Sequence, residues 1–156
     1  MIFCLYTNHG ALNSQPVFNA FAKSVIDAGH TVIYNEPYRV GNHYNNYDVA
    51  VIWSVLWHGR MDKNKTVWEQ NRLEDRPVIV LEVGSLHRGY LWKVGLNGIN
   101  RDAYFAPKNN DSSRADMLGL KLQPWKNNPD GPIVICTQHT KSHQWHNMPP
   151  VDKWLH

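Results

Sequence analysis

The chain has 156 residues, a net charge of +3 at pH 7 and a pI near 8.9. That length is enough for one domain with a hydrophobic core, or for one domain and the beginning of another. The weak positive charge permits an anionic partner without requiring one. The sequence contains neither a run of about 20 apolar residues, which a membrane span needs, nor a secretory signal at its start. We therefore expect a soluble cytoplasmic protein with no membrane partner.

Both cysteines, Cys4 and Cys136, lie inside apolar runs. This placement indicates buried thiols in a reducing compartment rather than a disulfide framework. Cys136 also precedes His139 and His143 at spacings that resemble a metal site. A structural zinc needs four ligands, usually from two such pairs, and the second pair is missing from the sequence. We therefore expect loop histidines at these positions and no metal.

The beginning of the sequence predicts one strand–helix–strand unit. An apolar run at residues 2–6 is followed by a polar turn, and apolar residues then recur at helical spacing over 16–28. Ser14 or Asn13 is the expected N-cap of that helix. Residues 31–36 are rich in β-branched and aromatic side chains, which predicts the second strand.

The same pattern then repeats. Residues 48–54 form a continuous apolar strand, residues 62–76 a helix with Asp62 as its cap, and residues 77–84 another apolar strand. Continuous apolar strands are typical of a parallel sheet that is covered on both faces. The alternation of strands and helices predicts an α/β fold with a Rossmann-like, doubly wound parallel sheet.

The last third of the sequence is polar and broken by Pro, Gly and Asn. It predicts a short helix at 112–118, a buried strand at 132–138 and the first turn of a helix within 148–156. A strand, a loop and a helix are how a second strand–helix–strand domain begins. We expect a Rossmann-like domain over 1–125 and the start of a second one, apparently incomplete, over 126–156.

In open parallel sheets, ligands bind at the carboxyl ends of the strands, so the loops after the strands hold the candidate site. The loop after the first strand has a single glycine and lacks G-x-G-x-x-G, which argues against an NAD- or FAD-dependent oxidoreductase. The absence of G-x-x-x-x-G-K-[ST] argues against a P-loop phosphotransferase. His9 in that first loop is a candidate ligand contact, and a plain loop residue is the alternative.

The stretch from 80 to 100 combines an acid, bases and aromatic side chains. Glu82 stands near the end of a buried strand, where lost solvation would make its carboxylate a stronger base; the alternative is a structural acid that accepts from nearby amides or pairs with Arg88. Basic side chains suit phosphate contacts and aromatic ones suit base stacking. A solvated basic surface with packed aromatic side chains explains the same residues equally well. These candidates are Arg60, Arg88, Lys93 and Arg101, with Trp57, Tyr90 and Trp92.

Residues 82–98 read E-V-G-S-L-x-R-G-x-x-W-x-x-G-x-N-G. This run resembles the N-terminal domain of phage-type glycosyltransferases built from two Rossmann domains (the GT-B architecture), especially those that place sugars on hydroxymethylated pyrimidines in DNA. The run G-P-I-V-I-C-T-Q at 131–138 is similar to the strand that opens their nucleotide-sugar domain. The likeness spans most of the chain, but only the first run is specific, and most of the donor domain has no counterpart here.

The resemblance implies a fold that is the N-terminal half of a GT-B enzyme. It also implies transfer of a sugar from a UDP-sugar, which is a co-substrate rather than a bound cofactor, to a flipped hydroxymethylpyrimidine in DNA. It assigns the base role to Glu82, with Asp102 second. The implied acceptor contacts are His9, Arg60, Arg88, Tyr90, Trp92 and Lys93, and the implied donor contacts are Gln138, His139, Lys141 and Ser142. If the protein is viral, we expect it in the cytoplasm of the host cell. A homo-oligomer is a further expectation.

Two other functions stay open. A non-catalytic Rossmann-like module that binds DNA or a nucleotide would show salt-dependent binding without sugar transfer. A glycosyltransferase with a polysaccharide or lipid acceptor would have no affinity for DNA and would expose an apolar patch near residues 145–154.

Overall fold

The structure is a computed structural model that describes residues 1–35, 46–104, 111–137, 145 and 148–155. The chain divides into two compact units, Met1–Phe105 (unit 1) and Ala106–His156 (unit 2). The boundary expected between residues 125 and 126 lies inside unit 2. Each unit is described by itself.

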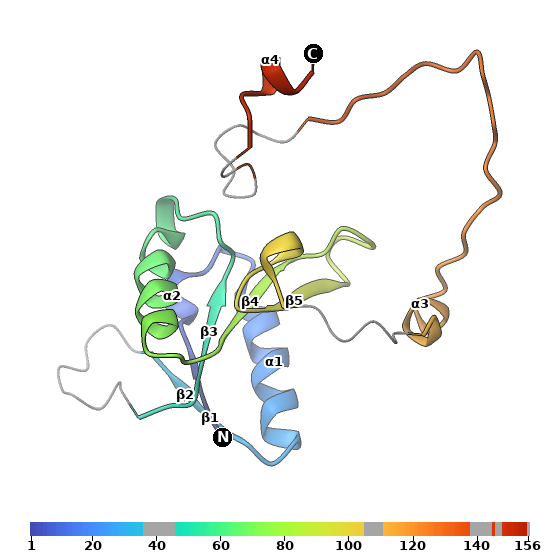
Figure 1. The fold of residues 1–156 in the computed structure, drawn as a ribbon. Coiled ribbons are helices and arrows are strands. Elements are labelled where there is room, and N and C mark those ends of the chain that lie inside the picture. Colours follow the sequence, from blue (N-terminus) through green and yellow to red (C-terminus); the bar gives the residue numbers. More distant parts are fainter. Residues whose placement is uncertain (36–45, 105–110, 138–144, 146–147, 156) are drawn as a thin grey trace. The chain divides into compact units, whose positions relative to one another are not determined.

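Unit 1 contains a five-stranded sheet with the strand order β2-β1-β3-β4-β5 (Figure 1). The first four strands are parallel, and β5 runs antiparallel to β4. Their bounds are Ile2–Leu5 for β1, Thr31–Tyr34 for β2, Val49–Trp53 for β3, Val78–Val83 for β4 and Trp92–Leu96 for β5. The predicted α/β fold with a mostly parallel sheet is confirmed, and it is compatible with a Rossmann-like arrangement. The sequence analysis did not predict the strand β5.

Two helices connect the parallel strands, as predicted. Helix α1 (Gln15–Asp27) follows β1, and helix α2 (Lys63–Leu73) follows β3. The side chain of Asp62 caps α2 by accepting from the Lys63 N–H at 2.7 Å. Ser14 occupies the N-cap position of α1, but its hydroxyl donates to the Ala11 carbonyl instead of capping the helix. Short 3-10 turns stand at Thr7–His9 (η1), Gly59–Met61 (η3) and Asn100–Asp102 (η4).

The sheet has a hydrophobic core on each face. One core packs α1 against β1, β3 and β4, with Phe18 and Trp53 among its fully buried side chains. The other packs α2 against the opposite face and contains Cys4, Ile52 and Val80. Cys4 is buried, as predicted, and burial raises the pKa of its thiol to about 11.

The hairpin between β4 and β5 depends on glycines. A Cβ on Gly84 would overlap the Leu91 carbonyl oxygen, and one on Gly95 would overlap the Gly98 carbonyl oxygen. Both neighbours are backbone atoms, so a side chain would have to push the chain itself aside. Two glycines of the run that resembles glycosyltransferases, Gly84 and Gly95, are therefore required by the local fold.

We expect Gly84→Ala to lower the free energy of unfolding by about 1–3 kcal/mol, because the added methyl group forces the two sides of the hairpin apart. Urea unfolding followed by tryptophan fluorescence measures the change. The matched control is Ser85→Ala at the next, exposed position, which should stay within about 0.5 kcal/mol of the parent. Equal stability of the two variants would show that the hairpin has room at Gly84.

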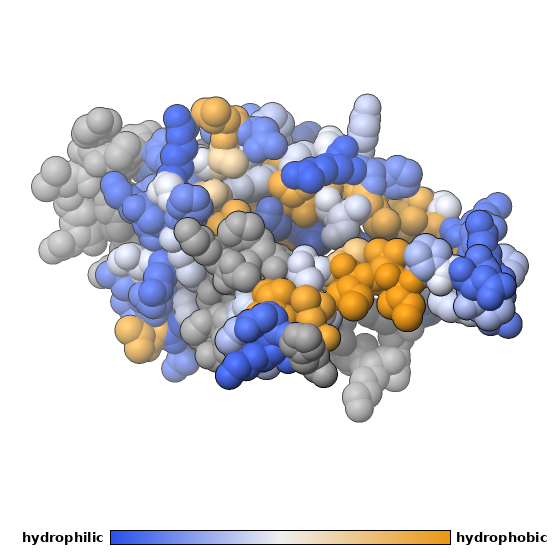
Figure 2. All heavy atoms as spheres, turned by 90° about the horizontal axis from the view of Figure 1, so that it is seen from above, coloured by the Kyte–Doolittle hydropathy of each residue, from blue (hydrophilic) through white to orange (hydrophobic). Residues whose placement is uncertain are grey.

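Unit 2 has two short helices in its described residues, α3 (Ser113–Met117) and α4 (Val151–Trp154), both near predicted positions. The strand predicted at 132–138 is wrong for the described residues 132–137, which form no strand. Figure 2 shows apolar side chains gathered at the surface, and those exposed in this segment are Ile133, Val134 and Ile135. Cys136 is exposed, so its predicted burial is also wrong. The physical reason is shared: an apolar run becomes a buried strand only where neighbouring strands pair with it.

None of the helices in the described parts of the chain has the length and apolar composition needed to cross a bilayer.

Candidate functional site

The site most suited to a ligand is the carboxyl edge of the parallel sheet between β1 and β3. The chain passes from β1 to β2 on one side and from β3 to β4 on the other, so the winding direction reverses between β1 and β3. Loops diverge at such a reversal, which is where open α/β sheets bind their ligands. In this chain those loops are residues 6–14 and 54–62.

The loop after β3 has an unusual backbone. Ser54 and Trp57 adopt positive φ angles of 64° and 48°, which side chains other than glycine rarely do, and Gly59 follows at 60°. Ser54 is held there because its N–H donates to the Leu81 carbonyl at 2.8 Å and its Oγ accepts from the Leu56 N–H at 3.2 Å. Backbone strain of this kind is concentrated at functional sites.

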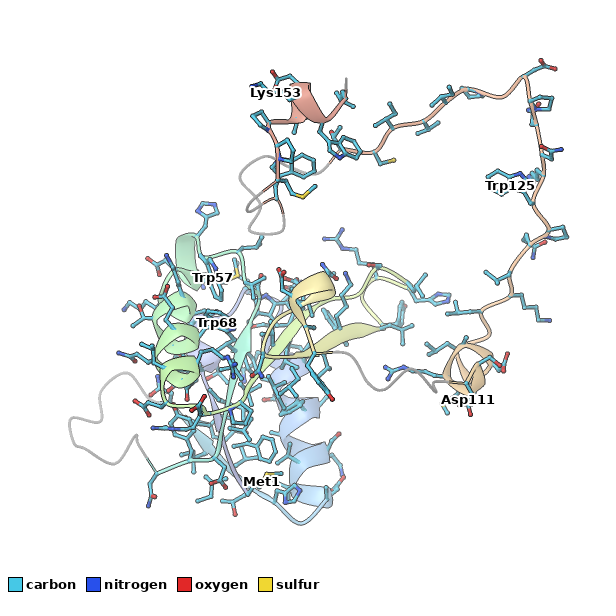
Figure 3. All side chains as sticks on the ribbon, in the orientation of Figure 1. Met1, Trp57, Trp68, Asp111, Trp125 and Lys153 are labelled. Carbon is cyan, nitrogen blue, oxygen red and sulfur yellow. The ribbon has the colours of Figure 1, made fainter. Side chains whose placement is uncertain are left out.

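Trp57 packs on the α2 side of the sheet. Its ring lies 6.2 Å from that of Trp68 between centroids, and the two are neighbours in Figure 3. Trp68 is fixed in turn, because its indole N–H donates to the Asn97 carbonyl at 3.0 Å. The ring of Trp57, for which the sequence predicted stacking on a base, therefore already has an aromatic neighbour in Trp68.

Asn64, in the first turn of α2, ties the two loops together. Its side-chain amide donates to the His9 carbonyl at 3.1 Å and to the Trp53 carbonyl at 2.5 Å. These two acceptors fix the orientation of the amide, because the opposite one would place the amide oxygen against two carbonyl oxygens. Asn64 is fully buried.

The His9 imidazole adjoins this amide. Nδ1 of His9 and Oδ1 of Asn64 are both buried, and neither makes a hydrogen bond of normal geometry in the described part of the structure. Asn64 nevertheless acts on the ring as a hydrogen-bond acceptor. Burial, followed by the positive charge of Lys63, lowers the pKa of His9, while Asp62 and Asn64 act in the opposite direction. His9 is therefore neutral at pH 7.

The hairpin loop after β4 carries the second group of predicted residues. His87, Arg88 and Tyr90 are exposed, with 86% of Tyr90 accessible. The loop is held by its backbone, because the His87 carbonyl accepts from the N–H groups of Tyr90 at 2.9 Å and Leu91 at 3.1 Å. A basic and an aromatic side chain are thus presented to solvent from a short, closed loop.

Glu82 and Lys93 face each other across β4 and β5. Glu82 is partly buried and lies within its strand rather than beyond the end; its carboxylate accepts from the Val83 N–H at 2.7 Å. Lys93 donates to the Asn100 side chain at 3.0 Å. Neither contact tests the predicted roles of the two residues.

The other predicted residues of unit 1 belong to three different elements. Trp92 is partly buried against the core, with its ring 5.8 Å from that of Trp53. Arg60 is exposed in η3, and Asp102 is exposed in η4. The predicted donor residues Gln138, His139, Lys141 and Ser142 lie outside the described residues. Within the described ranges, the structure brings no three metal-ligating side chains together.

Asn64 and Ser54 were missed by the sequence analysis. The sequence predicted a helix over 62–76 but did not indicate which of its polar side chains are buried. A signal was nevertheless present: Asn64, Val67 and Asn71 recur at helical spacing, and all three are buried. A buried asparagine on such a face marks a helix that bonds to backbone of neighbouring segments.

Comparison of the chain with known protein families, with curated proteins and with solved structures finds no match.

Proposed function

We propose that unit 1 is the acceptor-binding half of a glycosyltransferase that moves a sugar from a UDP-sugar to a hydroxymethylated pyrimidine in DNA. The observation that carries the proposal is the hairpin of β4 and β5. It contains residues 82–96 of the run that resembles such enzymes, and its loop exposes Arg88 and Tyr90.

A loop of this composition suits an anionic polymer with flat rings. Arg88 offers several donors to a phosphate, and the exposed ring of Tyr90 offers a surface on which a base can stack. A hydroxymethyl group on a paired base is difficult to reach, so the target base would be flipped out of the duplex. Tyr90 is better placed than Trp92 for this contact, since Trp92 is packed against Trp53.

The proposed reaction is a single displacement. The hydroxymethyl oxygen of the base forms a bond to the anomeric carbon, and the bond from that carbon to the diphosphate oxygen breaks, its electron pair leaving with UDP. Glu82 is the first candidate from the sequence to take the hydroxyl proton, and Asp102 is the second.

A transfer assay tests the proposal directly. The protein is incubated with DNA that contains 5-hydroxymethylcytosine or 5-hydroxymethyluracil and with a mixture of UDP-sugars, and the digested nucleosides are weighed by mass spectrometry. We expect a nucleoside heavier by one hexose.

Arg88→Ala should weaken DNA binding. It should also reduce the slope of the logarithm of the DNA-binding constant against the logarithm of the salt concentration by about 0.9, the effect of one lost phosphate contact. Lys23→Ala removes the same charge from an exposed position of α1 and should leave both unchanged.

The second candidate function is a DNA- or nucleotide-binding module without catalysis. It is favoured by unit 2, whose described residues contain two short helices and no strand. Salt-dependent DNA binding with no mass shift would select this function. If the protein neither binds DNA nor transfers a sugar to it, a DNA acceptor is rejected. Transfer to a lipid or polysaccharide would then be tested, because Trp145 and Trp154 stack edge to face and Trp154 is 45% exposed.

A further inference from the structure

Two buried polar atoms are left without a normal hydrogen bond in the described structure, and they are neighbours at the carboxyl edge. They are Nδ1 of His9 and Oδ1 of Asn64. A buried polar atom without a partner is costly, so such atoms are rare in folded proteins. A ring nitrogen that carries a proton satisfies both at once, since it can donate to the amide oxygen.

The orientation of Asn64 leaves one arrangement for the ring. Its amide nitrogen is already engaged by the carbonyls of His9 and Trp53, so only its oxygen remains for the imidazole. The oxygen can only accept, and Nδ1 must therefore hold the proton. In a neutral imidazole the lone pair is then on Nε2.

Within the described part of the chain, Nε2 of His9 is available to a ligand. The ring is only partly buried, and Nε2 has no hydrogen-bond partner among the described residues. The groups that surround the ring are Tyr6 at the end of β1, whose ring centroid lies 5.9 Å away, and Asp62, Lys63 and Asn64 at the start of α2. The phenol of Tyr6 is directed elsewhere, because its oxygen pairs with the Tyr47 hydroxyl at 3.0 Å.

We infer that His9, held by Asn64 with its proton on Nδ1, is the group that takes the proton of the acceptor hydroxyl at Nε2. The inference rests on the proposed function and replaces Glu82 in the base role. As the hydroxyl oxygen bonds to the anomeric carbon and UDP leaves with the electron pair, the hydroxyl proton passes to Nε2. The resulting imidazolium is stabilised by the Asn64 oxygen and by the Asp62 carboxylate. The lowered pKa of His9 keeps the ring neutral and ready at pH 7.

The tautomer is tested on the whole chain by long-range ¹H–¹⁵N NMR of histidine-labelled protein, with His9→Gln used to assign the signals. We expect a protonated Nδ1 and a bare Nε2 at pH 7, and a titration midpoint below the ordinary histidine value of about 6.5. A bare Nδ1 would overturn the inference and leave the proposed function standing. The measurement does not require an active enzyme.

The role in transfer is tested with the assay described above. His9→Gln should reduce the rate about 100-fold or more with unfolding unchanged, whereas Lys23→Ala, at an exposed position of α1, should retain the rate. An unchanged rate in His9→Gln overturns this inference alone. No transfer by the parent protein with any donor and acceptor overturns the proposed function and the proton-transfer role together.

A pair of charge variants separates proton transfer from a structural role. Lys63→Gln removes a cation that disfavours imidazolium, so the NMR midpoint of His9 and the acid limb of the rate profile should both move to higher pH. Lys65→Gln, on an exposed position of the same helix, should move neither. A shift of the NMR midpoint without a shift of the rate profile would overturn the role of His9.

Discussion

Replacing Trp53 with alanine is expected to lower the free energy of unfolding by about 3–5 kcal/mol, because it is the largest of the fully buried side chains among the described residues. Trp53 is 2% exposed and joins α1 to the hairpin, because its ring contacts Phe18 at 6.4 Å and Trp92 at 5.8 Å between centroids. Its removal leaves a cavity that rings on both sides cannot fill. Urea unfolding followed by circular dichroism measures the change.

Trp125→Ala is the matched control for Trp53→Ala. Trp125 is 90% exposed in unit 2, so its loss should change the free energy of unfolding by no more than about 0.5 kcal/mol. If Trp53→Ala does not fold, Trp53→Phe keeps a ring at this position and should cost about 1.5 kcal/mol. A parent-like unfolding curve for Trp53→Ala would show that α1 and β5 do not share a core.

The second large effect is expected at Asn64. Asn64→Ala removes both donors that join the His9 and Trp53 carbonyls, and it leaves buried acceptors without partners. We expect a loss of about 3 kcal/mol in the free energy of unfolding, because an unsatisfied buried polar group costs about 1–3 kcal/mol. The same urea titration measures it. In this variant the His9 ring should also no longer be held with its proton on Nδ1.

Asn19→Ala is the control for Asn64→Ala. Asn19 is exposed on α1, where its side chain accepts only from Gln15, so the expected change is about 0.5 kcal/mol or less. A loss as small in Asn64→Ala would mean that water takes the place of the amide, and that the carboxyl edge is more open to solvent than its burial indicates.

The parallel part of the fold was predictable because each element has a strong pattern. Strand β3 is an unbroken apolar run and is buried at every position, and α1 has apolar residues at helical spacing. Strand β5 has no such pattern. It has a glycine at its fourth position and exposed residues at Val94 and Leu96, because it lies at the edge of the sheet with one neighbour. Pairing with β4, which sequence periodicity does not reveal, decides its structure.

The candidate site was predictable only in part. The position of His9 at this edge was predictable, because the loops that follow parallel strands all lie at the carboxyl edge of the sheet. Its tautomer was not predictable, because it depends on the direction of one amide group from a helix 55 residues away in the chain. At residues 132–137 the reverse holds: the local pattern is strong, but the described residues of unit 2 contain no strand that pairs with it.

The antiparallel direction of β5 also bears on how unit 1 folds. β4 and β5 are joined by a short reversal, so their contacts are local, whereas β1 and β3 bring together residues that are far apart in the chain. Closing a short loop costs little entropy and takes microseconds, and distant parallel pairing is slower. The hairpin that contains the basic and aromatic residues is therefore expected to take shape before the sheet it completes. Its local geometry is encoded almost entirely within residues 78–96.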